Sequence, residues 1–512
     1  MNDGRQRERP GGGAESSDPG PAGAWGRLAR FVGFGTIGVT GLGVNQLALW
    51  LATESLGLHY LLSAALATAA STSWNFLLVE KLVFAGGREG RPRRFIQFAL
   101  LNTAWLALRI PLLYLLTEAL GMHYLLSNLL LLGASSLVRF GLSDFWIWAP
   151  KELHLYDLHG IVGISSEAPL PELANFRVGS LAGRPHLEVL VRWQGFGGLA
   201  SRVRVEAAEH RVSYVEHIGG AGFALTADLS GPLIARVPPL LRLSPHVLYT
   251  NVVEPMLRWL LVERGYALAH AACLEIDGSG LLLTSRTDTG KTSTCLKVVA
   301  SAGARFLSDD MTILSPDGRA FSYPKPLTIS AHTLSALSAI WGGASLPLWR
   351  RVWLVFQGRL HSRSGRRVGM WLARRNLPVA TLNALVQLFV PPPKFSLERL
   401  IPGAELLTSV MVTRMVAIER GKESVEELSL DEACRILLEN TDDAFRFPPY
   451  PRLASALMDG KGEVEAGLLR QVLKGVGCVR LTTPDHSWDR HLSGLAARAK
   501  AERALAESEA NK

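Results

Sequence analysis

The stretch LLLTSRTDTGKTSTCLKVV, from Leu281 to Val299, predicts a buried strand, a tight turn and the start of a helix. A phosphate-binding loop needs converging backbone N–H groups, a helix N-terminus, a lysine for the phosphates and a hydroxyl for Mg²⁺. The triplet Gly-Lys-Thr at the end of this turn supplies the lysine and the hydroxyl. The stretch therefore predicts a nucleotide site formed by Ser285, Thr289, Gly290, Lys291, Thr292 and Ser293.

The first position of this loop departs from the usual pattern G-x-x-x-x-G-K-[ST], because Ser285 stands where glycine is expected. Glycine at that position serves the conformation of the turn more than contact with phosphate. Serine can replace it if its dihedral angles stay in an allowed region. A Gly-Lys-Thr triplet alone is equally typical of a surface turn before a helix.

A pair of carboxylates follows downstream in ARFLSDDMTIL, where Asp309 and Asp310 end a short predicted strand. Paired carboxylates at a strand end suit Mg²⁺ coordination and proton transfer from an attacking hydroxyl. The alternative is a solvated acidic turn. We assign Asp309 and Asp310 as candidate catalytic residues, and these two with Thr292 as candidate metal ligands.

The segment from HAACLEIDGSG, beginning at His270, to PKPLTIS, ending at Ser330, resembles the HPr kinase/phosphorylase and ATP-type phosphoenolpyruvate carboxykinase superfamily. The resemblance implies an α/β fold with ATP and Mg²⁺ as cofactors. By this resemblance Lys291 would bind phosphate, Thr292 would hold Mg²⁺, Asp309 would be metal ligand or base, Asp310 its metal-linked partner, and His270 would lie near the site. Ser285 is the clear departure, and it bears on catalysis more than on the fold.

Four apolar segments near the N-terminus each approach the roughly 20 residues that a bilayer requires. They are Phe31–Leu51, Leu61–Val79, Phe95–Leu116 and Tyr124–Trp146. The second pair repeats the first, because RFVGF at Arg30 matches RFIQF at Arg94, and TESLGLHYLLS at Thr53 matches TEALGMHYLLS at Thr117. The offset is constant (94 − 30 = 64 and 117 − 53 = 64). A constant offset indicates a duplicated two-helix hairpin, and both copies enter the membrane from the same side.

The distribution of charge predicts the orientation of these spans. The chain has 512 residues and a net charge of +9. Arginines gather before the first span and between the second and third, whereas the loops TESLGLHY and TEALGMHY carry no Lys or Arg. The positive-inside rule then places both termini in the cytoplasm of a multi-pass inner (plasma) membrane protein. These basic loops explain the positive charge without a nucleic-acid partner, and the four cysteines show no spacing typical of a disulfide framework or zinc site.

Polar residues at membrane depth are the candidate lipid contacts. The repeat pairs Asn45 with Arg109, and Asn75 with Arg139. A charged group in hydrocarbon is costly, so both arginines should face the bundle interior or a polar cavity. One interpretation is recognition of an anionic lipid head group, since arginine binds phosphate bidentately. The other is an interhelical clasp to Asn75, Glu80 or Asp144, or snorkelling near a span end. Trp146 and Trp148 are more typical of interface anchors than of ligand contacts.

Four spans, an Arg-Phe at the start of each pair and NFLLVEKLVF from Asn75 resemble the GtrA family, over about Arg30 to Pro150. That family is associated with moving polyprenyl-phosphate-linked sugars across the membrane during polysaccharide synthesis. The resemblance implies such a lipid as partner, with glycosyltransferases of the same pathway as further partners. Arg139 in place of a second Asn, and Glu80-Lys81 where two basic residues are usual, depart from the family pattern. Four short spans enclose little volume, so we also expect a homodimer.

The expected organisation is multi-domain, with an all-α four-helix transmembrane domain followed by a cytoplasmic α/β HPr-kinase-like domain that has a small β-rich N-terminal subdomain. The predicted parts are a disordered arm (1–29), the membrane domain (30–150), the β-rich subdomain (151–250), the ATP-binding domain (251–495) and a tail (496–512). Residues 340–394 form a basic, Trp-rich insert that suits an interfacial helix on anionic lipid. RNA binding and a charged helical lid are the alternatives for this insert.

Three functions fit these observations. The first is a transport-associated membrane protein of cell-envelope polysaccharide synthesis, whose ATP-binding domain regulates or drives it. The second is a membrane-anchored kinase of a lipid, sugar or protein hydroxyl. The third is a catalytically degenerate nucleotide sensor, which Ser285 motivates. Intramembrane polar residues favour the first, because a simple anchor does not need Arg109.

Overall fold

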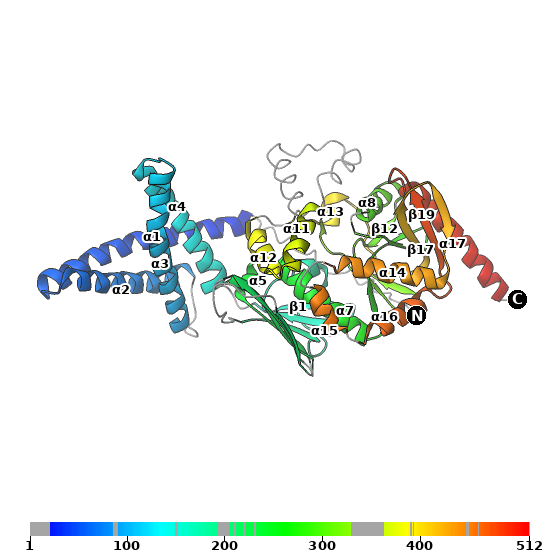
Figure 1. Cartoon of the computed structure of the whole chain (residues 1–512), viewed down its shortest axis with the longest axis horizontal. Coiled ribbons are helices and arrows are strands. Elements are labelled where there is room, and N and C mark those ends of the chain that lie inside the picture. Colours follow the sequence, from blue (N-terminus) through cyan, green and yellow to red (C-terminus); the bar gives the residue numbers. More distant parts are fainter. Residues whose placement is uncertain are drawn as a thin grey trace, which may run out of the picture. The chain divides into compact units, whose positions relative to one another are not determined.

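The computed structural model describes residues 21–84, 91–148, 152–192, 204–208, 211–218, 221–229, 232–287, 289–328, 363–389, 392, 394–446, 450–458 and 460–510. The chain divides into two compact units, Met1–Lys151 and Glu152–Lys512. In Figure 1 the first unit is coloured blue to cyan and the second runs from green to red. The predicted order of a four-helix apolar region followed by an α/β part is confirmed.

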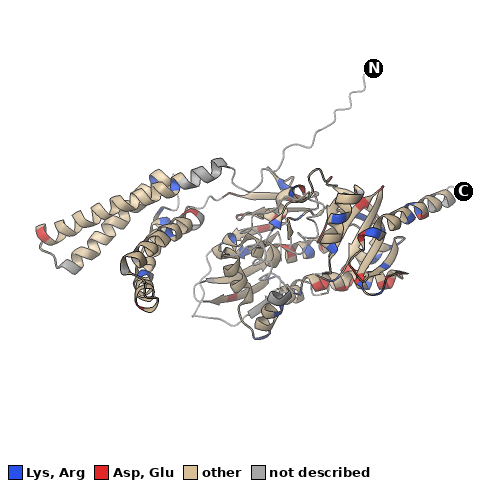
Figure 2. Cartoon of the chain, turned by 90° about the horizontal axis from the view of Figure 1, so that it is seen from above, with Lys and Arg blue, Asp and Glu red and all other residues tan. Residues whose placement is uncertain are grey.

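The first unit consists of four long apolar helices. They are α1 (Pro21–Trp50), α2 (Tyr60–Leu78), α3 (Arg91–Tyr114) and α4 (Tyr124–Leu142), and each continues into a π-helical turn: η1 (Leu51–Ser55), η2 (Val79–Val83), η3 (Leu115–Ala119) and η4 (Ser143–Ile147). All four are long and apolar enough to span a bilayer. Figure 2 shows few charged residues along them. Helix α1 begins at Pro21, so residues 21–29, which were assigned to the disordered arm, are helical.

The repeat is visible in the packing of the two hairpins. Arg30 at the start of the first repeat pairs with Asp144 at the end of the second, with Nη1 2.9 Å from Oδ1. Its repeat mate Arg94 pairs with Glu80, the mate of Asp144, with Nη2 2.6 Å from Oε1. Each hairpin therefore clasps the other through the same pair of positions, as expected for two copies related by a pseudo-two-fold axis.

Aromatic rings beside these ion pairs also make repeat-related contacts between the two hairpins. Phe31 packs edge-on against Phe140 with ring centroids 5.4 Å apart. Their repeat mates, Phe95 and Phe76, repeat the contact at 5.2 Å. Such edge-to-face contacts bury large apolar area with favourable ring electrostatics. The two hairpins are thus joined by matched contacts at one end of the bundle.

Phe84 and Trp148 are repeat mates of each other (84 + 64 = 148), and their rings stack at 4.7 Å with an interplanar angle of 10°. Two mates can touch only close to the axis that relates the repeats, so this stack marks the pseudo-two-fold axis. Trp148 also packs against Phe76 and Phe98. The Trp148 ring therefore contributes to the packing between the hairpins, whereas its predicted role as an interface anchor stays a prediction.

The second unit begins with a mixed eight-stranded sheet in the order β3-β1-β2-β4-β8-β7-β6-β5. Its strands are β1 (His154–Leu158), β2 (Val162–Ser166), β3 (Arg177–Val178), β4 (Leu187–Val191), β5 (Arg204–Ala208), β6 (Arg211–Ile218), β7 (Ala221–Asp228) and β8 (Leu233–Val237). Alternate residues of β1, β4 and β8 are buried, as one face of a half-covered sheet requires. This sheet is the predicted β-rich part.

A second mixed sheet has the path β12-β10-β11-β17-β14-β13-β9, with β19 beside β17 and β18 beside β19. Its strands are β9 (Ala267–Ala269), β10 (Ala271–Ile276), β11 (Ser279–Thr284), β12 (Arg305–Ser308), β13 (Thr312–Leu314), β14 (Arg319–Phe321), β17 (Ser409–Arg420), β18 (Ser424–Glu427) and β19 (Gly477–Thr483). A separate short pair joins β15 (Leu327–Thr328) to β16 (Lys394–Phe395). Strands β11, β17 and β19 run parallel.

Helices cover both faces of the second sheet. Helices α8 (Lys291–Ala302) and α17 (Asp489–Ala510) pack on one face, and α14 (Leu430–Ala444) and α16 (Gly462–Leu473) pack on the other. The strands alternate accordingly, with Leu281 and Leu283 facing α8 and Leu282 facing the opposite core. This three-layer arrangement buries the sheet on both sides. Helix α17 includes most of the predicted tail.

The first sheet shares its core with neighbouring helices and with part of the second sheet. These helices are α5 (Pro239–Leu243), α6 (Pro245–Leu248), η6 (Tyr249–Val253), α7 (Glu254–Glu263), α12 (Val379–Phe389) and α15 (Tyr450–Leu457). The predicted boundary after residue 250 falls inside η6 and within this core. The two sheets therefore belong to one compact unit. Two further short helices are η5 (Pro171–Phe176) and α13 (Leu397–Leu400), and the insert contributes α11 (Arg363–Arg374).

Candidate functional site

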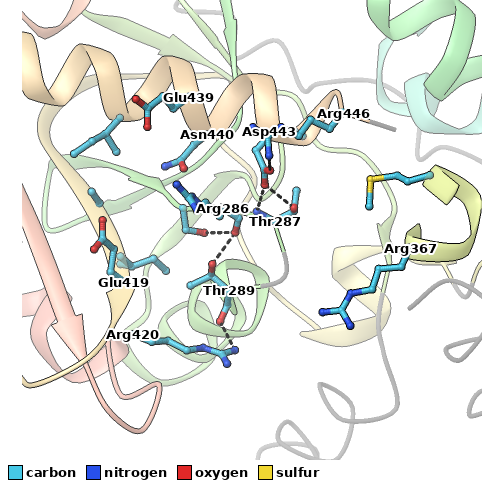
Figure 3. A pocket seen from close by; sticks show the side chains of 16 residues that line it. Arg286, Thr287, Thr289, Arg367, Glu419, Arg420, Glu439, Asn440, Asp443 and Arg446 are labelled. Carbon is cyan, nitrogen blue, oxygen red and sulfur yellow. Dashed lines mark hydrogen bonds and ion pairs between the residues drawn. The ribbon is translucent and has the colours of Figure 1, made fainter. Parts of the chain in front are cut away.

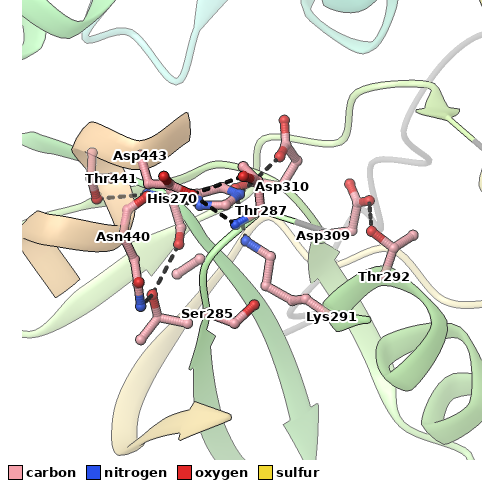
Figure 4. Close-up of polar contacts among 12 residues, drawn as sticks. His270, Ser285, Thr287, Lys291, Thr292, Asp309, Asp310, Asn440, Thr441 and Asp443 are labelled. Atoms are coloured by element: carbon pink, nitrogen blue, oxygen red, sulfur yellow. Dashed lines mark hydrogen bonds and ion pairs between the residues drawn. The ribbon is translucent and has the colours of Figure 1, made fainter. Parts of the chain in front are cut away.

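Three strands of the second sheet bring the predicted site residues to one edge. Antiparallel pairing places the start of β10, at Ala271, beside Thr284 at the end of β11. Strand β12 ends at Ser308, also on this edge. His270, the loop after Thr284 and the pair Asp309-Asp310 all follow from these termini, so segments far apart in the sequence converge (Figure 4).

The predicted phosphate-binding loop connects β11 to the N-terminus of α8. Ser285 is absent from the non-glycine residues with positive φ in the described part of the chain, so serine occupies the first loop position without left-handed strain. Gly290 has φ +129°, and an ideal Cβ there would lie 3.2 Å from both His486 Nδ1 and Trp488 Cζ3. The second glycine position of the motif is therefore required both by backbone conformation and by space.

Lys291, Thr292 and Asp309 meet at the N-terminus of α8. Lys291 is 6% exposed and its Nζ donates to the backbone carbonyl of Asp310 at 3.4 Å. The Thr292 hydroxyl donates to Asp309 Oδ2 at 3.1 Å. Figure 4 shows the lysine side chain lying between the Thr292–Asp309 pair and the His270–Asp310 pair. An ammonium, a hydroxyl and a carboxylate at a helix N-terminus are the groups that a nucleotide phosphate and its cation use.

Asp310 is held by two basic side chains. Its Oδ2 lies 2.6 Å from Lys325 Nζ and its Oδ1 lies 3.3 Å from His270 Nε2. Lys325 also pairs with Glu254 Oε1 at 2.7 Å, which in turn accepts from the Tyr249 hydroxyl at 3.0 Å. Both oxygens of Asp310 are thus engaged, and in this conformation Asp309 is the carboxylate directed at Thr292.

The two carboxylates have opposite pKa shifts. Burial, reinforced by the Asp310 charge, raises the pKa of Asp309 to about 7. Burial would also raise the pKa of Asp310, but Lys325 and His270 outweigh it and hold that pKa well below its ordinary value. Burial lowers the pKa of Lys291 to about 8, against the opposing charges of Asp310 and Asp309. Divergent environments of neighbouring carboxyl groups are typical of acid–base sites.

The remaining predicted loop residues support the turn. Thr289 donates its hydroxyl to the Arg286 carbonyl at 2.7 Å, and its own carbonyl accepts from Arg420 Nη2 at 3.1 Å. Ser293 lies in the first turn of α8 and is partly buried. Thr287, which was not predicted, donates its backbone N–H and its hydroxyl to Asp443 Oδ2 at 3.1 and 2.8 Å.

A pocket of about 750 Å³ lies beside this loop (Figure 3). Its lining includes Arg286 and Thr287 of the loop, Arg420 at the end of β17 and Asn440 of α14. Helix α11 of the insert adds Arg367. The carboxyl ends of the parallel strands β11 and β17 meet here, which is where open α/β sheets commonly bind ligands.

Several of these residues were missed by sequence reasoning. Asn440 donates to the Thr284 hydroxyl at 3.1 Å, while its carbonyl lies 3.1 Å from His270 Nδ1. Lys325 stands between two prolines in PKPLTIS, a quoted motif that could have identified it. Asn440 and Asp443 lie late in α14, where nothing in the local sequence separates a site residue from a solvated helix end.

The four polar residues of the membrane unit fall into two unlike sets. Asn45 Nδ2 lies 3.4 Å from Ser71 Oγ, and the buried Asn75 Oδ1 has no donor among the described residues. Arg139 Nη1 donates to Asn102 Oδ1 at 2.9 Å. The predicted clasps from Arg139 to Asn75, Glu80 or Asp144 are therefore not the contact observed, because Glu80 and Asp144 are already paired with Arg94 and Arg30. Arg109 is partly buried.

Comparison with known proteins gives different results for the two units. No curated protein matches the chain. Among solved structures, the Hpr(Ser) kinase/phosphatase from Coxiella burnetii aligns with 46% of this chain and 98% of its own, at 10% identity and a TM-score of 0.20. Residues 33–148, which hold the four apolar helices, match the family model described as GtrA/DPMS, transmembrane domain. The membrane unit of this chain is therefore a domain of the GtrA/DPMS transmembrane family.

Proposed function

We propose that this chain handles polyprenyl-phosphate-linked sugar in the inner membrane during cell-envelope polysaccharide synthesis, under the influence of a cytoplasmic nucleotide-binding domain. The match of residues 33–148 to the GtrA/DPMS model supports the membrane part. The arginine distribution supports cytoplasmic termini. The observation that carries the proposal is the environment of Arg139.

Arg139 differs from the other arginines of the bundle. Arg30 and Arg94 each lie against a carboxylate. Arg139 contacts only neutral acceptors among the described residues, the side chain of Asn102 and the backbone carbonyl of Ser135. A guanidinium within a span that has no carboxylate partner keeps its charge available for an anionic ligand. A phosphate that is joined to a long apolar chain supplies one, and arginine binds it bidentately.

A second arginine lies in the same unit. Arg109 is the repeat mate of Asn45 and is partly buried. Opposite charges attract strongly in a medium of low polarity, so a second cation in this unit would add to the attraction for a phosphate. The repeat mate of Arg139 is the neutral Asn75, so only the second hairpin offers a guanidinium at this position.

The test uses the full chain in proteoliposomes and follows translocation of a short-chain polyprenyl-phosphate-linked sugar. Arg139→Asn should reduce the rate by at least about tenfold, because a charge-assisted hydrogen bond contributes about 1.5–3 kcal/mol. Arg139→Lys should retain part of the activity, since lysine keeps the positive charge but cannot donate two parallel hydrogen bonds as a guanidinium does. Arg211→Asn is the control, because Arg211 is an exposed arginine of the second unit. Equal rates for Arg139→Asn and the control would refute the proposal.

A second candidate function, a kinase acting on a hydroxyl, is favoured by the Thr292–Asp309 contact. A hydroxyl and a carboxylate oxygen 3.1 Å apart fit Mg²⁺, which is usually held by few protein oxygens together with substrate phosphates. Thr292 and Asp309 would hold the cation, and Lys291 would bind the phosphates of ATP. The bound cation would neutralise phosphate charge. In the alternative role that the resemblance implies, Asp309 would not hold the cation, and its carboxylate would accept the proton of an acceptor hydroxyl.

Nucleotide binding is tested by calorimetry of the full chain with Mg-ATP, alongside phosphate release. Lys291→Ala should abolish binding, whereas Asp309→Asn should retain nucleotide affinity in part and lose turnover. Lys297→Ala is the matched control, because Lys297 lies on the same helix and pairs with Asp489 at 3.6 Å. Binding without turnover would favour a nucleotide sensor. Turnover that survives Arg139→Asn would favour a membrane-anchored kinase. No binding in a folded chain would refute the nucleotide site.

A further inference from the structure

The insert presents an exposed basic and aromatic helix face. Val368 and Trp371 of α11 are 57% and 51% exposed, although both are large apolar side chains. Arg374 and Arg375 are also exposed, and Arg375 lies over the Trp371 ring with its guanidinium carbon 4.0 Å from the centroid. At 3.6 residues per turn, Val368, Trp371 and Arg374 fall within an arc of ~120° on α11, and Arg375 follows directly after the helix. We call them the α11 face.

The opposite side of α11 packs inward and is firmly mounted. Gly369 is buried and Met370 is partly buried. The helix is followed by Asn376 in the left-handed conformation, and Asn376 Oδ1 accepts from Arg452 Nη1 at 2.9 Å. The next helix, α12, is fixed to the first sheet, because the Phe223 backbone N–H donates to the Thr381 hydroxyl at 2.9 Å. The α11 face is therefore displayed on a rigid support.

Charge and composition identify what covers this face. Arg374 has no carboxylate partner within the part of the chain that the structure describes. Tryptophan with flanking arginines and a valine is the composition of a helix lying at a lipid–water boundary, where the ring enters the head-group region and arginines bind lipid phosphates. The same chain carries four helices able to span a bilayer, so a membrane surface is always within tethered reach.

We propose that the α11 face docks on the anionic surface of the membrane in which the chain is anchored. Docking would have a consequence for the nucleotide-binding unit. Arg367 lies in the same arc of α11, between Trp371 and Arg374, and it extends toward the pocket beside the predicted phosphate loop (Figure 3). Contact of α11 with lipid would bring that pocket to the level of the head groups. The proposal does not depend on the chemistry at Asp309.

The experiment places a polarity-sensitive fluorophore at Val368→Cys in the full chain, reconstituted in nanodiscs. The four native cysteines are buried, so an exposed cysteine is labelled selectively. In discs of phosphatidylcholine with phosphatidylglycerol, the label should shift its emission to the blue and lose quenching by aqueous iodide. In discs of phosphatidylcholine alone, both changes should be weaker. Val464→Cys is the matched control, because Val464 is 48% exposed on α16.

A second variant separates docking from misfolding. Arg374→Gln/Arg375→Gln should remove the lipid dependence at Val368→Cys while leaving nucleotide binding and thermal unfolding unchanged. Equal quenching in both lipid compositions would overturn the proposal, and so would an equal shift at Val464→Cys. Protection by single-stranded RNA in detergent, with none from anionic lipid, would also overturn it and make the α11 face a nucleic-acid site.

Discussion

The two hairpins of the membrane unit match in their ion pairs and differ in the polar residues within the spans. Arg30 with Asp144 and Arg94 with Glu80 are related residue by residue. At another pair of repeat-related positions, the first hairpin has Asn75, whereas the second has Arg139. The symmetry of the repeat therefore holds for the ion pairs between the hairpins and does not hold for these polar residues.

Residues that match between the hairpins and residues that differ between them are expected to have different roles. Matched contacts are what two copies of one hairpin need in order to associate, whichever ligand they carry. A single lipid phosphate cannot respect a two-fold axis unless it lies on it, so a site for one such ligand gains from unlike residues on the two sides. Arg139, which has only neutral partners among the described residues, is one of the residues that differ between the two repeats. Substitutions at matched and at differing positions of the two hairpins test this distinction.

The largest effect is expected from breaking the clasp at Glu80. Glu80 is 3% exposed and faces Arg94, so Glu80→Ala removes the carboxylate from a largely buried arginine. We expect a loss of about 3 kcal/mol in the free energy of unfolding, as for other buried pairs that lose one member. Denaturant titration in detergent micelles measures it.

Substitution of Asp144, the repeat mate of Glu80, is the control. Asp144→Ala should cost less, about 1 kcal/mol or below, because Arg30 is 40% exposed and water screens the pair. Exchange of charges in Arg94→Glu/Glu80→Arg should restore part of the loss. Equal losses for Glu80→Ala and Asp144→Ala would contradict the exposure argument.

An intermediate effect is expected at Gly41, where α1 passes close to Asn75. An ideal Cβ at Gly41 would lie 2.2 Å from Asn75 Oδ1, so Gly41→Ala must displace the amide or the helix. We expect a loss of about 2 kcal/mol, typical of overpacking. In the double variant Gly41→Ala/Asn75→Ala the loss should shrink, and a double-mutant cycle without coupling would show that the two residues do not meet.

The smallest effect is expected at the axis. Trp148→Phe makes the second hairpin identical to the first at this position and retains a ring opposite Phe84. We expect a change of no more than about 1 kcal/mol, since an aromatic pair contributes about 0.5–1.5 kcal/mol beyond area burial. Trp148→Ala should cost about 3 kcal/mol as a large-to-small core change. Thermal unfolding of both variants compares them, and equal losses would argue against a stack at the axis.

Much of the membrane unit could be predicted from the sequence. The constant offset of 64 and the hydropathy of the spans are local signals, and the structure has the four expected helices. The ion pairs between the two hairpins could not be predicted from the sequence, because nothing in the sequence near Arg30 indicates that Asp144 is its partner. The inward packing of Trp148 was missed for the same reason, since a tryptophan at a span end is also typical of an interface anchor.

The candidate nucleotide site also contains residues that the sequence predicted and residues that it did not. The loop at Gly290 and the carboxylates at Asp309 stand in contiguous motifs, and β10, β11 and β12 bring them to one edge. Asp443 could not be assigned to that edge from local pattern, because it lies near the end of an amphipathic helix. Lys325 stands in the quoted motif PKPLTIS, but the motif alone does not show that Lys325 contacts Asp310. Their roles depend on which elements pack together.

The most direct test of the central claim is the binding of a polyprenyl phosphate to the full chain in nanodiscs, followed by native mass spectrometry with and without Arg139→Asn. The account predicts a bound lipid on the unaltered chain and at least about a tenfold loss of affinity in the variant, with unfolding changed by no more than about 1 kcal/mol. Equal lipid occupancy in the two proteins would contradict it. Arg139 would then serve only to join two helices through its hydrogen bond to Asn102, and a bound lipid would not explain the difference between the hairpins.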